Sequence, residues 1–511
     1  MMKQRLIKLL CAAMVPMLLL TGCWQDELPE EDETVLPPDE SMEELAETAR
    51  LPEIFSLPYD PSLTLDPITC PDGMQQTAAS LLYEGLFRLD SQFAPENVLC
   101  ESYTYDPQDL RYTFTLRPGI TFSDGSPLTT TDVKATLERA RSSGRYAARL
   151  SSIASIAARE DHLVISLTAP NTALPSLLDI PIVKKGTEQD AVPIGTGPYF
   201  FSQEEHGAFL IANQSWWQQA TQPAERIALA EADGHDAMLY RFTSHDVQLI
   251  TADLTGTQPV SVTGNVSCYD APTTVFQYLG INVNREGLSD PALRRALWGG
   301  IHRSHVVSAY LSGHGTASQF PISPASALYP KELEIPYSHA SFSSALAQCQ
   351  SLPGRSLTLL VNEENSFKVS IAQYLADTFT AGGVRVEVTV LPWEEYTAAL
   401  AAGSFDLYYG EVRLTADWDL SPLLMTGASL NYGGWSDPQT DQLLAAFQSS
   451  EDRKAAMEKV CSHLKNQAPI LPVCFKATSV LTQSDVIEGL SPTATEPFYL
   501  LGNCVLHLQE T

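Results

Sequence analysis

Residues 112–141, "YTFTLRPGITFSDGSPLTTTDVKATLERAR", place a strand pattern, a turn pattern and a helix pattern in immediate succession. Apolar and polar residues alternate in "RYTFTL", which predicts a strand. "SDGSPLT" predicts a turn, because its Asp-Gly pair tolerates positive φ and Pro127 stiffens the exit. A helix is expected over "TTDVKATLERAR", with Thr130 or Thr131 as its N-cap and Asp132 in its first turn. The block therefore predicts a chain that mixes sheets and helices.

The same mixture continues along the chain. "SLTLLVN", "VRVEVTVL" and "FDLYYGEVRL" are predicted strands, and "VSIAQYLADTFTAGG" is a predicted helix between the first two. A strand, a helix and a strand in this order are typical of a mixed or parallel sheet covered by helices. Further predictions are strands at "IFSLPY" and "HLVISL", a helix leading toward a strand in "QQTAASLLYEGLFRL", two helices around Gly299-Gly300, and late helices at "TDQLLAAFQSS" and "DRKAAMEKVCSHLKNQ".

The first residues have the layout of a secretory signal. An apolar run from Leu9 to Leu20 follows a basic segment. As a helix it would be about 18 Å long, which is too short for the roughly 30 Å hydrocarbon core of a membrane. It ends at Leu20-Thr21-Gly22-Cys23, which resembles the bacterial lipobox, whose cysteine receives a diacylglyceryl group. We therefore expect residues 1–22 to be a lipoprotein signal peptide and Cys23 to be the lipidated residue that anchors the protein outside the cytoplasm, on the cell membrane.

Residues 23–50 are predicted to be an acidic, flexible linker. From residue 24 to residue 50 the chain has eleven acidic side chains and one basic one, Arg50. Such a segment buries too little apolar surface to fold, and its like charges extend it. The net charge of the whole chain is -30, which argues against nucleic acid as a partner.

Size and motifs limit the remaining possibilities. A chain of 511 residues exceeds the usual single core, so two or three lobes are expected. Of nine cysteines, Cys11 lies in the signal and Cys23 is the lipidation candidate, which leaves an odd number and at least one outside intramolecular disulfides. No cysteine pair has CxxC spacing, and neither GxSxG nor HExxH occurs. We therefore expect no metal, no cofactor and no catalytic residue.

Seven blocks of sequence together resemble one family, the bacterial extracellular solute-binding proteins of family 5, which include oligopeptide- and dipeptide-binding proteins of ABC importers. The most specific block is residues 112–133. In chain order the blocks are Leu65-Asp66-Pro67, "LLYEGLFRLD" (81–90), "YTFTLRPGITFSDGSPLTTTDV" (112–133), "PIGTGPYFF" (193–201), "LGINVNREGLSDPALRRALWGGIHR" (279–303), "NYGGWSDPQTDQLL" (431–444) and "APILPV" (468–473).

The resemblance implies an α/β, two-lobed periplasmic-binding-protein-like (Venus flytrap) fold with an additional third domain. Ligand sits between the lobes of such a protein, which close by hinge bending. The implied domains are binding lobe I at 51–85, 195–275 and 482–511, an extra domain II at 86–194, and binding lobe III at 276–481.

The resemblance also implies a function. We expect a monomeric, lipid-anchored receptor that captures peptides and delivers them to an ABC permease and its ATPase subunits. The alternatives are a non-peptide solute such as a nickel chelate, haem or an oligosaccharide, a role in nutrient or pheromone sensing, and an extracellular hydrolase. Product formation from peptides or glycans would indicate the hydrolase.

Asp417 is the expected partner for the ammonium group of a bound peptide, by resemblance to peptide-binding relatives. An ammonium group in a closed cleft needs a carboxylate, and Asp417 in "FDLYYGEVRLTADWDLSP" occupies the matching Ala-Asp position. Asp419 is the nearby alternative, and either carboxylate could instead cap the turn after the strand. Some relatives have Trp three residues before this Asp, where this chain has Leu414.

Further ligand contacts are expected around this residue and from the first lobe. The backbone of Leu414, Thr415 and Ala416 could pair with an extended ligand as an added strand. Possible apolar walls are Trp418, Tyr432 and Trp435, for which ordinary packing is the alternative. The residues expected to face the ligand from lobe I are Cys70, Pro71 and Asp72.

Three other features suggest chemistry but have simpler interpretations. Trp216-Trp217 suggests stacking on a ligand, although packing within lobe I is the more usual role by resemblance. His314 in "SGHGTAS" is interpreted as a solvated loop histidine rather than a metal ligand. Gly195-x-Gly197 enters a strand and so lacks the context of a dinucleotide-binding loop.

Overall fold

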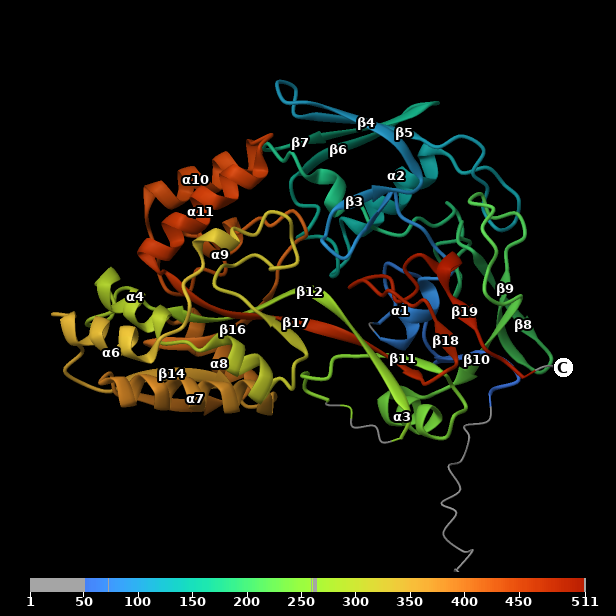
Figure 1. Ribbon diagram of the computed structural model, residues 1–511. Coiled ribbons are helices and arrows are strands. Elements are labelled where there is room, and N and C mark those ends of the chain that lie inside the picture. Colours follow the sequence, from blue (N-terminus) through green and yellow to red (C-terminus); the bar gives the residue numbers. More distant parts are fainter. Residues whose placement is uncertain (1–50, 72, 259, 261–263, 510–511) are drawn as a thin grey trace, which may run out of the picture. The chain divides into compact units, whose positions relative to one another are not determined.

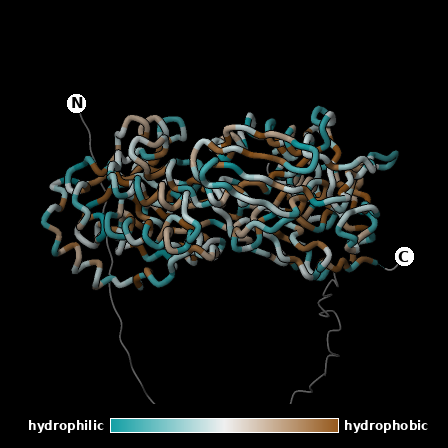
Figure 2. Tube along the Cα trace, turned by 90° about the horizontal axis from the view of Figure 1, so that it is seen from above, coloured by the Kyte–Doolittle hydropathy of each residue, from teal (hydrophilic) through white to brown (hydrophobic). Residues whose placement is uncertain are grey.

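The computed structural model describes residues 51–509 except 72, 259 and 261–263. The predicted signal peptide, lipidation residue Cys23, acidic linker and contact residue Asp72 lie outside the described residues. Within the described part, no helix combines the length and apolar character that a membrane span requires. Figure 2 shows hydrophilic and hydrophobic residues interspersed along this part of the chain.

Two long antiparallel strands, β12 (Val266–Ile281) and β17 (Ile470–Gln483), run through the largest sheet (Figure 1). One end of β17 pairs with β11 (Leu249–Ala252), and one end of β12 pairs with β16 (Leu407–Arg413). Register shifts between Pro272 and Phe276, and between Gln277 and Tyr278, interrupt the ladder. Bulges of this kind bend and twist a strand pair. We call β12 and β17 the crossing strands because they connect the surroundings of β11 with those of β16.

The far side of this sheet contains the predicted strand-helix-strand unit. β14 (Leu357–Asn362) pairs in parallel with both β15 (Val386–Leu391) and β16, and α7 (Ser366–Gly382) connects β14 to β15. Asn365 caps α7 by accepting a hydrogen bond from Lys368 N at 3.1 Å. Gly383 ends the helix at φ 109°, a left-handed conformation that favours glycine. These predicted elements are confirmed.

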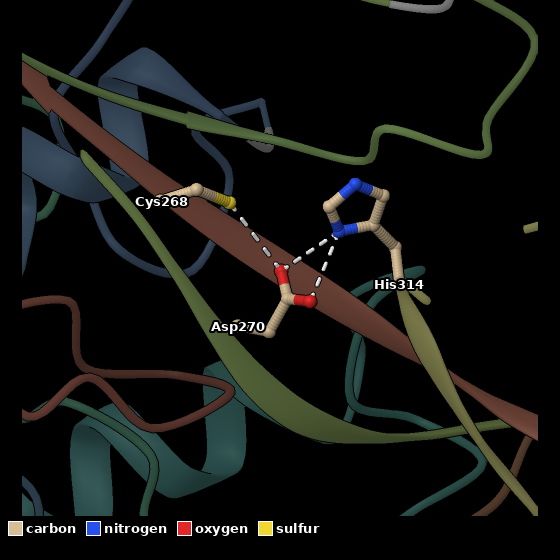
Figure 3. Close-up of side chains that lie close together, drawn as sticks. All are labelled: Cys268, Asp270 and His314. Carbon is tan, nitrogen blue, oxygen red and sulfur yellow. Dashed lines mark hydrogen bonds and ion pairs between the residues drawn. The ribbon is translucent and has the colours of Figure 1, made fainter. Parts of the chain in front are cut away.

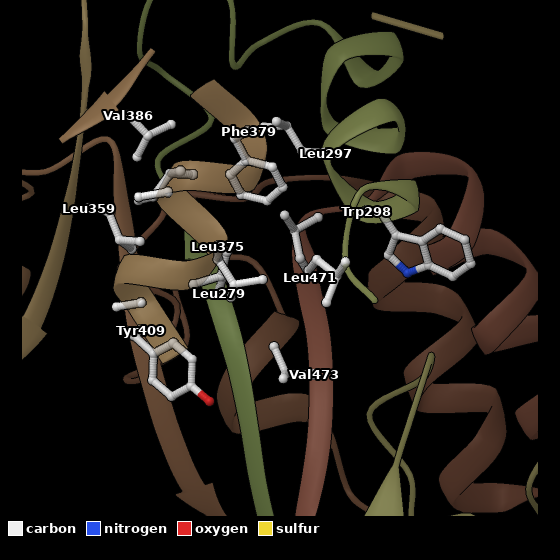
Figure 4. Packing of buried hydrophobic residues seen from close by; sticks show 14 of the residues in the cluster. Leu279, Leu297, Trp298, Leu359, Leu375, Phe379, Val386, Tyr409, Leu471 and Val473 are labelled. Atoms are coloured by element: carbon white, nitrogen blue, oxygen red, sulfur yellow. The ribbon is translucent and has the colours of Figure 1, made fainter. Parts of the chain in front are cut away.

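The core of this region lies between α7 and the sheet (Figure 4). Leu375 and Phe379 are spaced four residues apart, so they project from one face of α7. They are fully buried in a cluster with Leu359, Tyr409 and Leu471 of three strands. Helices α4 (Pro291–Gly299) and α6 (His339–Gln348) contribute to the same cluster.

A separate antiparallel sheet has the order β4 (Cys100–Asp106), β5 (Arg111–Leu116), β7 (His162–Leu167), β6 (Ile153–Ala158). The predicted strands "RYTFTL" and "HLVISL" are confirmed here. The predicted helix is α2 (Thr130–Ala140), but its N-cap is Thr129, so the prediction of Thr130 or Thr131 was wrong. Thr129 is extended at φ -128°, and its N–H donates to the Asp132 carboxylate at 2.9 Å, which closes the first turn.

The third large sheet has the order β1 (Ser56–Tyr59), β10 (Arg226–Glu231), β9 (Gly207–Ala212), β8 (Tyr199–Glu204). Helix α1 (Met74–Ala79) is shorter than the predicted one. The helix stops because the backbone that follows it forms hydrogen bonds with a distant segment instead of continuing the helix. Gly197 N donates to Leu82 O at 3.0 Å. A side chain at Gly195 or Gly197 would collide with the backbone of Leu82, which explains both glycines.

The remaining elements connect these sheets. The helices are α3 (Gly234–Thr243), α5 (Arg303–His305), α8 (Trp393–Ala401), α9 (Ser421–Leu424), α10 (Pro438–Ser449) and α11 (Arg453–Gln467). The short strands are β2 (Phe87–Leu89), β3 (Pro95–Asn97), β13 (Gly315–Ala317), β18 (Ile487–Glu488) and β19 (Val505–Leu506). The predicted break at Gly299-Gly300 is confirmed by the end of α4. The domain boundaries expected above stay a prediction.

Candidate functional site

Asp417 is buried in the turn between β16 and α9, where it is 3% exposed. Its Oδ1 accepts from Thr415 Oγ1 at 2.5 Å and from Asp419 N at 3.3 Å. Its Oδ2 accepts from Asn171 Nδ2 at 2.8 Å. Burial raises the pKa of Asp417, and the charge of Asp419 raises it further.

The three donors leave Asp417 with remaining acceptor capacity. A carboxylate has about four acceptor positions, and the described residues donate three hydrogen bonds to this one. Two of the donors belong to its own turn. The third, Asn171, is 246 residues away in sequence. A further donor, such as an ammonium group, would satisfy the remaining position and lower the raised pKa.

The surroundings of Asp417 are held together by contacts between distant segments. Arg453, at the start of α11, donates to the Asp417 backbone carbonyl oxygen. Thr172 N donates to Gln448 O at 3.0 Å, and Thr172 Oγ1 donates to Ser450 O at 2.8 Å. The 171–172 segment is thereby fixed against the α10–α11 connection.

The residues beside Asp417 have different environments. Trp418 is buried and contacts Phe93 and Phe475 edge-on, with ring centroids 5.2 and 6.0 Å away. Its φ of 56° is a strained conformation for a bulky residue. Asp419 is only partly buried, and its Oδ1 accepts from Ser421 N at 2.9 Å, as expected of a carboxylate that caps a turn.

The backbone segment predicted to pair with a ligand is partly engaged. Leu414 N donates to Thr274 O at 2.9 Å, and Trp418 N donates to Thr415 O at 2.9 Å. An extended ligand that pairs with this segment as an added strand therefore has to bond to the other backbone groups of Leu414, Thr415 and Ala416. This pairing stays a prediction.

The two candidate aromatic walls are half-buried. Tyr432 lies edge-on to Tyr408, with ring centroids 6.1 Å apart. Trp435 donates Nε1 to Thr440 Oγ1 at 3.2 Å, and the Arg294 guanidinium lies 5.4 Å from its ring centroid. Both rings thus have packing partners within the same region, and a ligand contact stays a prediction.

The segment predicted to face the ligand from the first lobe is held by an ion pair. Both Asp66 carboxylate oxygens accept from Arg139 of α2, at 2.6 and 2.7 Å. Asp66 O accepts from Cys70 N at 2.8 Å. Cys70 is fully buried, whereas Pro71 is exposed. The Leu65-Asp66-Pro67 motif therefore positions the segment, and Pro71 is the more accessible of its described candidates.

Sequence reasoning missed a charge network around the buried Lys476 at the crossing strands. Lys476 of β17 is 4% exposed, and its Nζ contacts the Asp253 carboxylate and lies 3.9 Å from Glu411 of β16. Glu411 also accepts from Gln277 Nε2 at 2.8 Å and lies 3.4 Å from Lys368 Nζ. The sequence does contain a signal for this network, because Lys476 and Glu411 interrupt otherwise apolar strands. Charged residues in such strands are almost never fully buried unless they are paired.

Trp216 and Trp217 contact a carboxylate. Their Nε1 atoms donate to Glu84 at 3.2 and 2.8 Å. Gln218 Nε2 and Thr196 Oγ1 donate to the same carboxylate at 3.2 and 2.9 Å. Burial nevertheless raises the pKa of Glu84 to about 7.

Known structures share this architecture. The ABC transporter substrate-binding protein CtaP from Listeria monocytogenes has a TM-score of 0.71 at 18% identity, with 89% of this chain and 98% of that chain covered. The oligopeptide-binding protein AppA from Bacillus subtilis, in complex with a nonapeptide, has a TM-score of 0.60 at 19% identity (90% and 99% covered). NikZ from Campylobacter jejuni, in complex with Ni(L-His), has a TM-score of 0.62 at 17% identity (89% and 99% covered). The fold is therefore that of a two-lobed periplasmic binding protein.

Sequence comparison gives the family. The model of the bacterial extracellular solute-binding proteins, family 5, matches residues 94–433. The glutathione-binding protein GsiB from Salmonella typhimurium is 26% identical over 417 residues, which cover 76% of this chain and 81% of that protein. The chain belongs to family 5 of the bacterial extracellular solute-binding proteins. It is a substrate-binding protein of an ABC importer and not an enzyme, as the resemblance implied.

Proposed function

We propose that this binding protein captures peptides with a free amino terminus and delivers them to the permease of its importer. The observation that carries the proposal is the remaining acceptor capacity of the buried Asp417 carboxylate. An ammonium group removed from water needs such a partner. Two comparisons support a peptide: GsiB is named for glutathione, a tripeptide with a free ammonium group, and AppA was crystallised with a nonapeptide.

A pair of ligands and a pair of variants test the proposal. Binding of one peptide with a free amino terminus, and of its N-acetylated form, is measured by calorimetry. The wild type should prefer the free amine by about 2–5 kcal/mol, the cost of leaving one partner of a buried charge pair alone. The preference should vanish in Asp417→Ala and in Asp417→Asn, which keeps the side-chain shape.

Two further variants give the experiment its controls. Asp419→Ala should keep the preference if Asp419 only caps the turn. Asp377→Ala, on the exposed face of α7, should behave as the wild type. Equal affinity for the two peptides, or a preference that survives in both Asp417 variants, would remove Asp417 from the ammonium site. Binding of glutathione or Ni(L-His) with no peptide binding would replace the proposed ligand class.

We also propose that Cys23 anchors the protein to the membrane through lipid. The support is the Leu20-Thr21-Gly22-Cys23 motif after a basic, apolar segment. In cells labelled with a radioactive fatty acid, the wild type should carry label and sediment with membranes. Cys23→Ser should lose both properties, and label retained in this variant would contradict the anchor.

A further inference from the structure

Three side chains with different metal-binding atoms meet beside the crossing strands (Figure 3). Cys268 and Asp270 are two residues apart on β12, so they project from the same face of the strand. His314 comes from the turn immediately before β13. One ligand atom of each residue lies within 4.8 Å of the other two.

The Asp270 carboxylate lies between the other two groups. Its Oδ2 and Oδ1 are 3.0 and 3.2 Å from His314 Nδ1, and its Oδ1 is 3.7 Å from Cys268 Sγ. Ser479, which faces Asp270 in the ladder between the crossing strands, donates Oγ to Oδ1 at 2.6 Å. Outer contacts of this type orient the ligands of metal sites.

The donor set selects a class of ion. Ca²⁺ and Mg²⁺ prefer oxygen ligands, whereas a thiolate, an imidazole and a carboxylate together suit Zn²⁺ and related borderline ions. Three protein ligands leave a fourth position for water or another ligand. Cys268 and Asp270 are exposed, so an ion can reach them from solvent.

We propose that Cys268, Asp270 and His314 bind one divalent transition-metal ion of the Zn²⁺ class. The ion takes the place of the thiol proton and of any proton on the coordinating imidazole nitrogen, so binding releases protons and weakens as the pH falls.

The position of the site gives the ion a structural consequence. Asp270 pairs with Ser479 on one side of the register shift in β12. On the same side of the shift, Pro272 pairs with Ala477, whose N–H donates to His314 O at 3.3 Å. β13 pairs with the next residues of β17, beginning with Gly315 opposite Lys476. A bound ion therefore cross-links two segments that are 44 residues apart in sequence, next to an irregularity of the crossing strands.

Cobalt titration of the purified full-length chain, under a reductant that does not bind metals, tests the site. Co²⁺ should bind with a thiolate-to-cobalt charge-transfer band in the near ultraviolet, and Zn²⁺ should displace it at one ion per chain. Cys268→Ser should lose the band. Asp270→Asn and His314→Gln should weaken binding by more than the roughly 10- to 100-fold expected for Ser479→Ala, which removes only the outer contact.

Matched variants and a second readout complete the test. Cys349→Ser and His206→Gln change a thiol and an imidazole outside the cluster and should bind Co²⁺ as the wild type does. Saturating Zn²⁺ should raise the melting temperature of the wild type and not that of His314→Gln. The proposal is overturned if no thiolate band forms, if the band persists in Cys268→Ser, or if the control variants lose it equally. None of these readouts depends on which solute the protein transports.

Discussion

Glu84 and Asp417 are both carboxylates with a raised pKa in low-dielectric surroundings, but their donors differ. Four side chains donate to Glu84, which matches the roughly four acceptor positions of a carboxylate. Asp417 receives three hydrogen bonds, two of them from its own turn. Glu84 is therefore expected to stabilise the fold, whereas Asp417 can accept one more hydrogen bond.

The largest expected effect is that of Glu84→Ala on stability. The substitution leaves four donors without their acceptor, and each buried unsatisfied group costs about 1–3 kcal/mol. The free energy of unfolding in urea should fall by at least about 3 kcal/mol, because water can rescue only the more exposed donors. Glu205→Ala, at an exposed position, is the control. A loss no larger than that of the control would end the structural interpretation of Glu84.

Glu496 is a neighbouring case of a carboxyl group whose pKa is raised by burial. Its pKa is raised to about 7, mainly by burial; the Arg88 guanidinium opposes the rise, and the charges of Glu84 and Glu96 add to it. The pKa of Glu496 is higher in the folded chain than in the unfolded chain. The contribution of the neutral Glu496 carboxyl group to the free energy of unfolding is therefore complete below about pH 4.5 and is lost as the pH rises through about 7. Glu496→Gln should therefore be more stable than the wild type at pH 8, by about 1–3 kcal/mol, and equal to it near pH 4.5. Urea midpoints measured at both pH values provide the check, and a difference that does not change with pH would refute it.

Asn171→Ala separates stability from binding at Asp417. Removal of this donor should lower the free energy of unfolding by about 1–2 kcal/mol. Peptide affinity should change by no more than about threefold, the range of a neutral substitution, because the other two donors still orient the carboxylate. A loss of affinity as large as that of Asp417→Asn would mean that Asn171 is essential to the site.

Thr196→Val gives the smallest expected effect. It removes one of the four donors to Glu84 and keeps the shape of a fully buried side chain. The free energy of unfolding should fall by about 1 kcal/mol, the net value of one hydrogen bond. An effect as large as that of Glu84→Ala would show that the four donors act as one unit.

Local structure was predicted well where it depends on local pattern. The unit of β14, α7 and β15 follows from alternating strands around a helix with apolar residues on one face. The N-cap of α2 was misplaced by one or two residues because Thr129, Thr130 and Thr131 have the same capping chemistry. Helix α1 was predicted too long because its C-terminal segment pairs with Gly197, which is far away in sequence.

Long-range partners were not predictable from spacing. Trp217 contacts a carboxylate 133 residues earlier, and Asn171 contacts one 246 residues later. His314 was interpreted as a solvated histidine because no ligand lies at a short spacing, yet the fold brings it beside Asp270. The position of Asp417 came from the family resemblance, and its role as the ammonium partner stays a prediction.

In our proposal, this binding protein holds a peptide by its free amino terminus. Native mass spectrometry of the protein purified from its own cells, without refolding, tests it most directly. We expect a co-purifying set of peptides with unmodified amino termini, absent from Asp417→Asn prepared in the same way. A metal chelate, haem or an oligosaccharide in place of peptides would contradict it, as would the same peptides at the same occupancy in the variant.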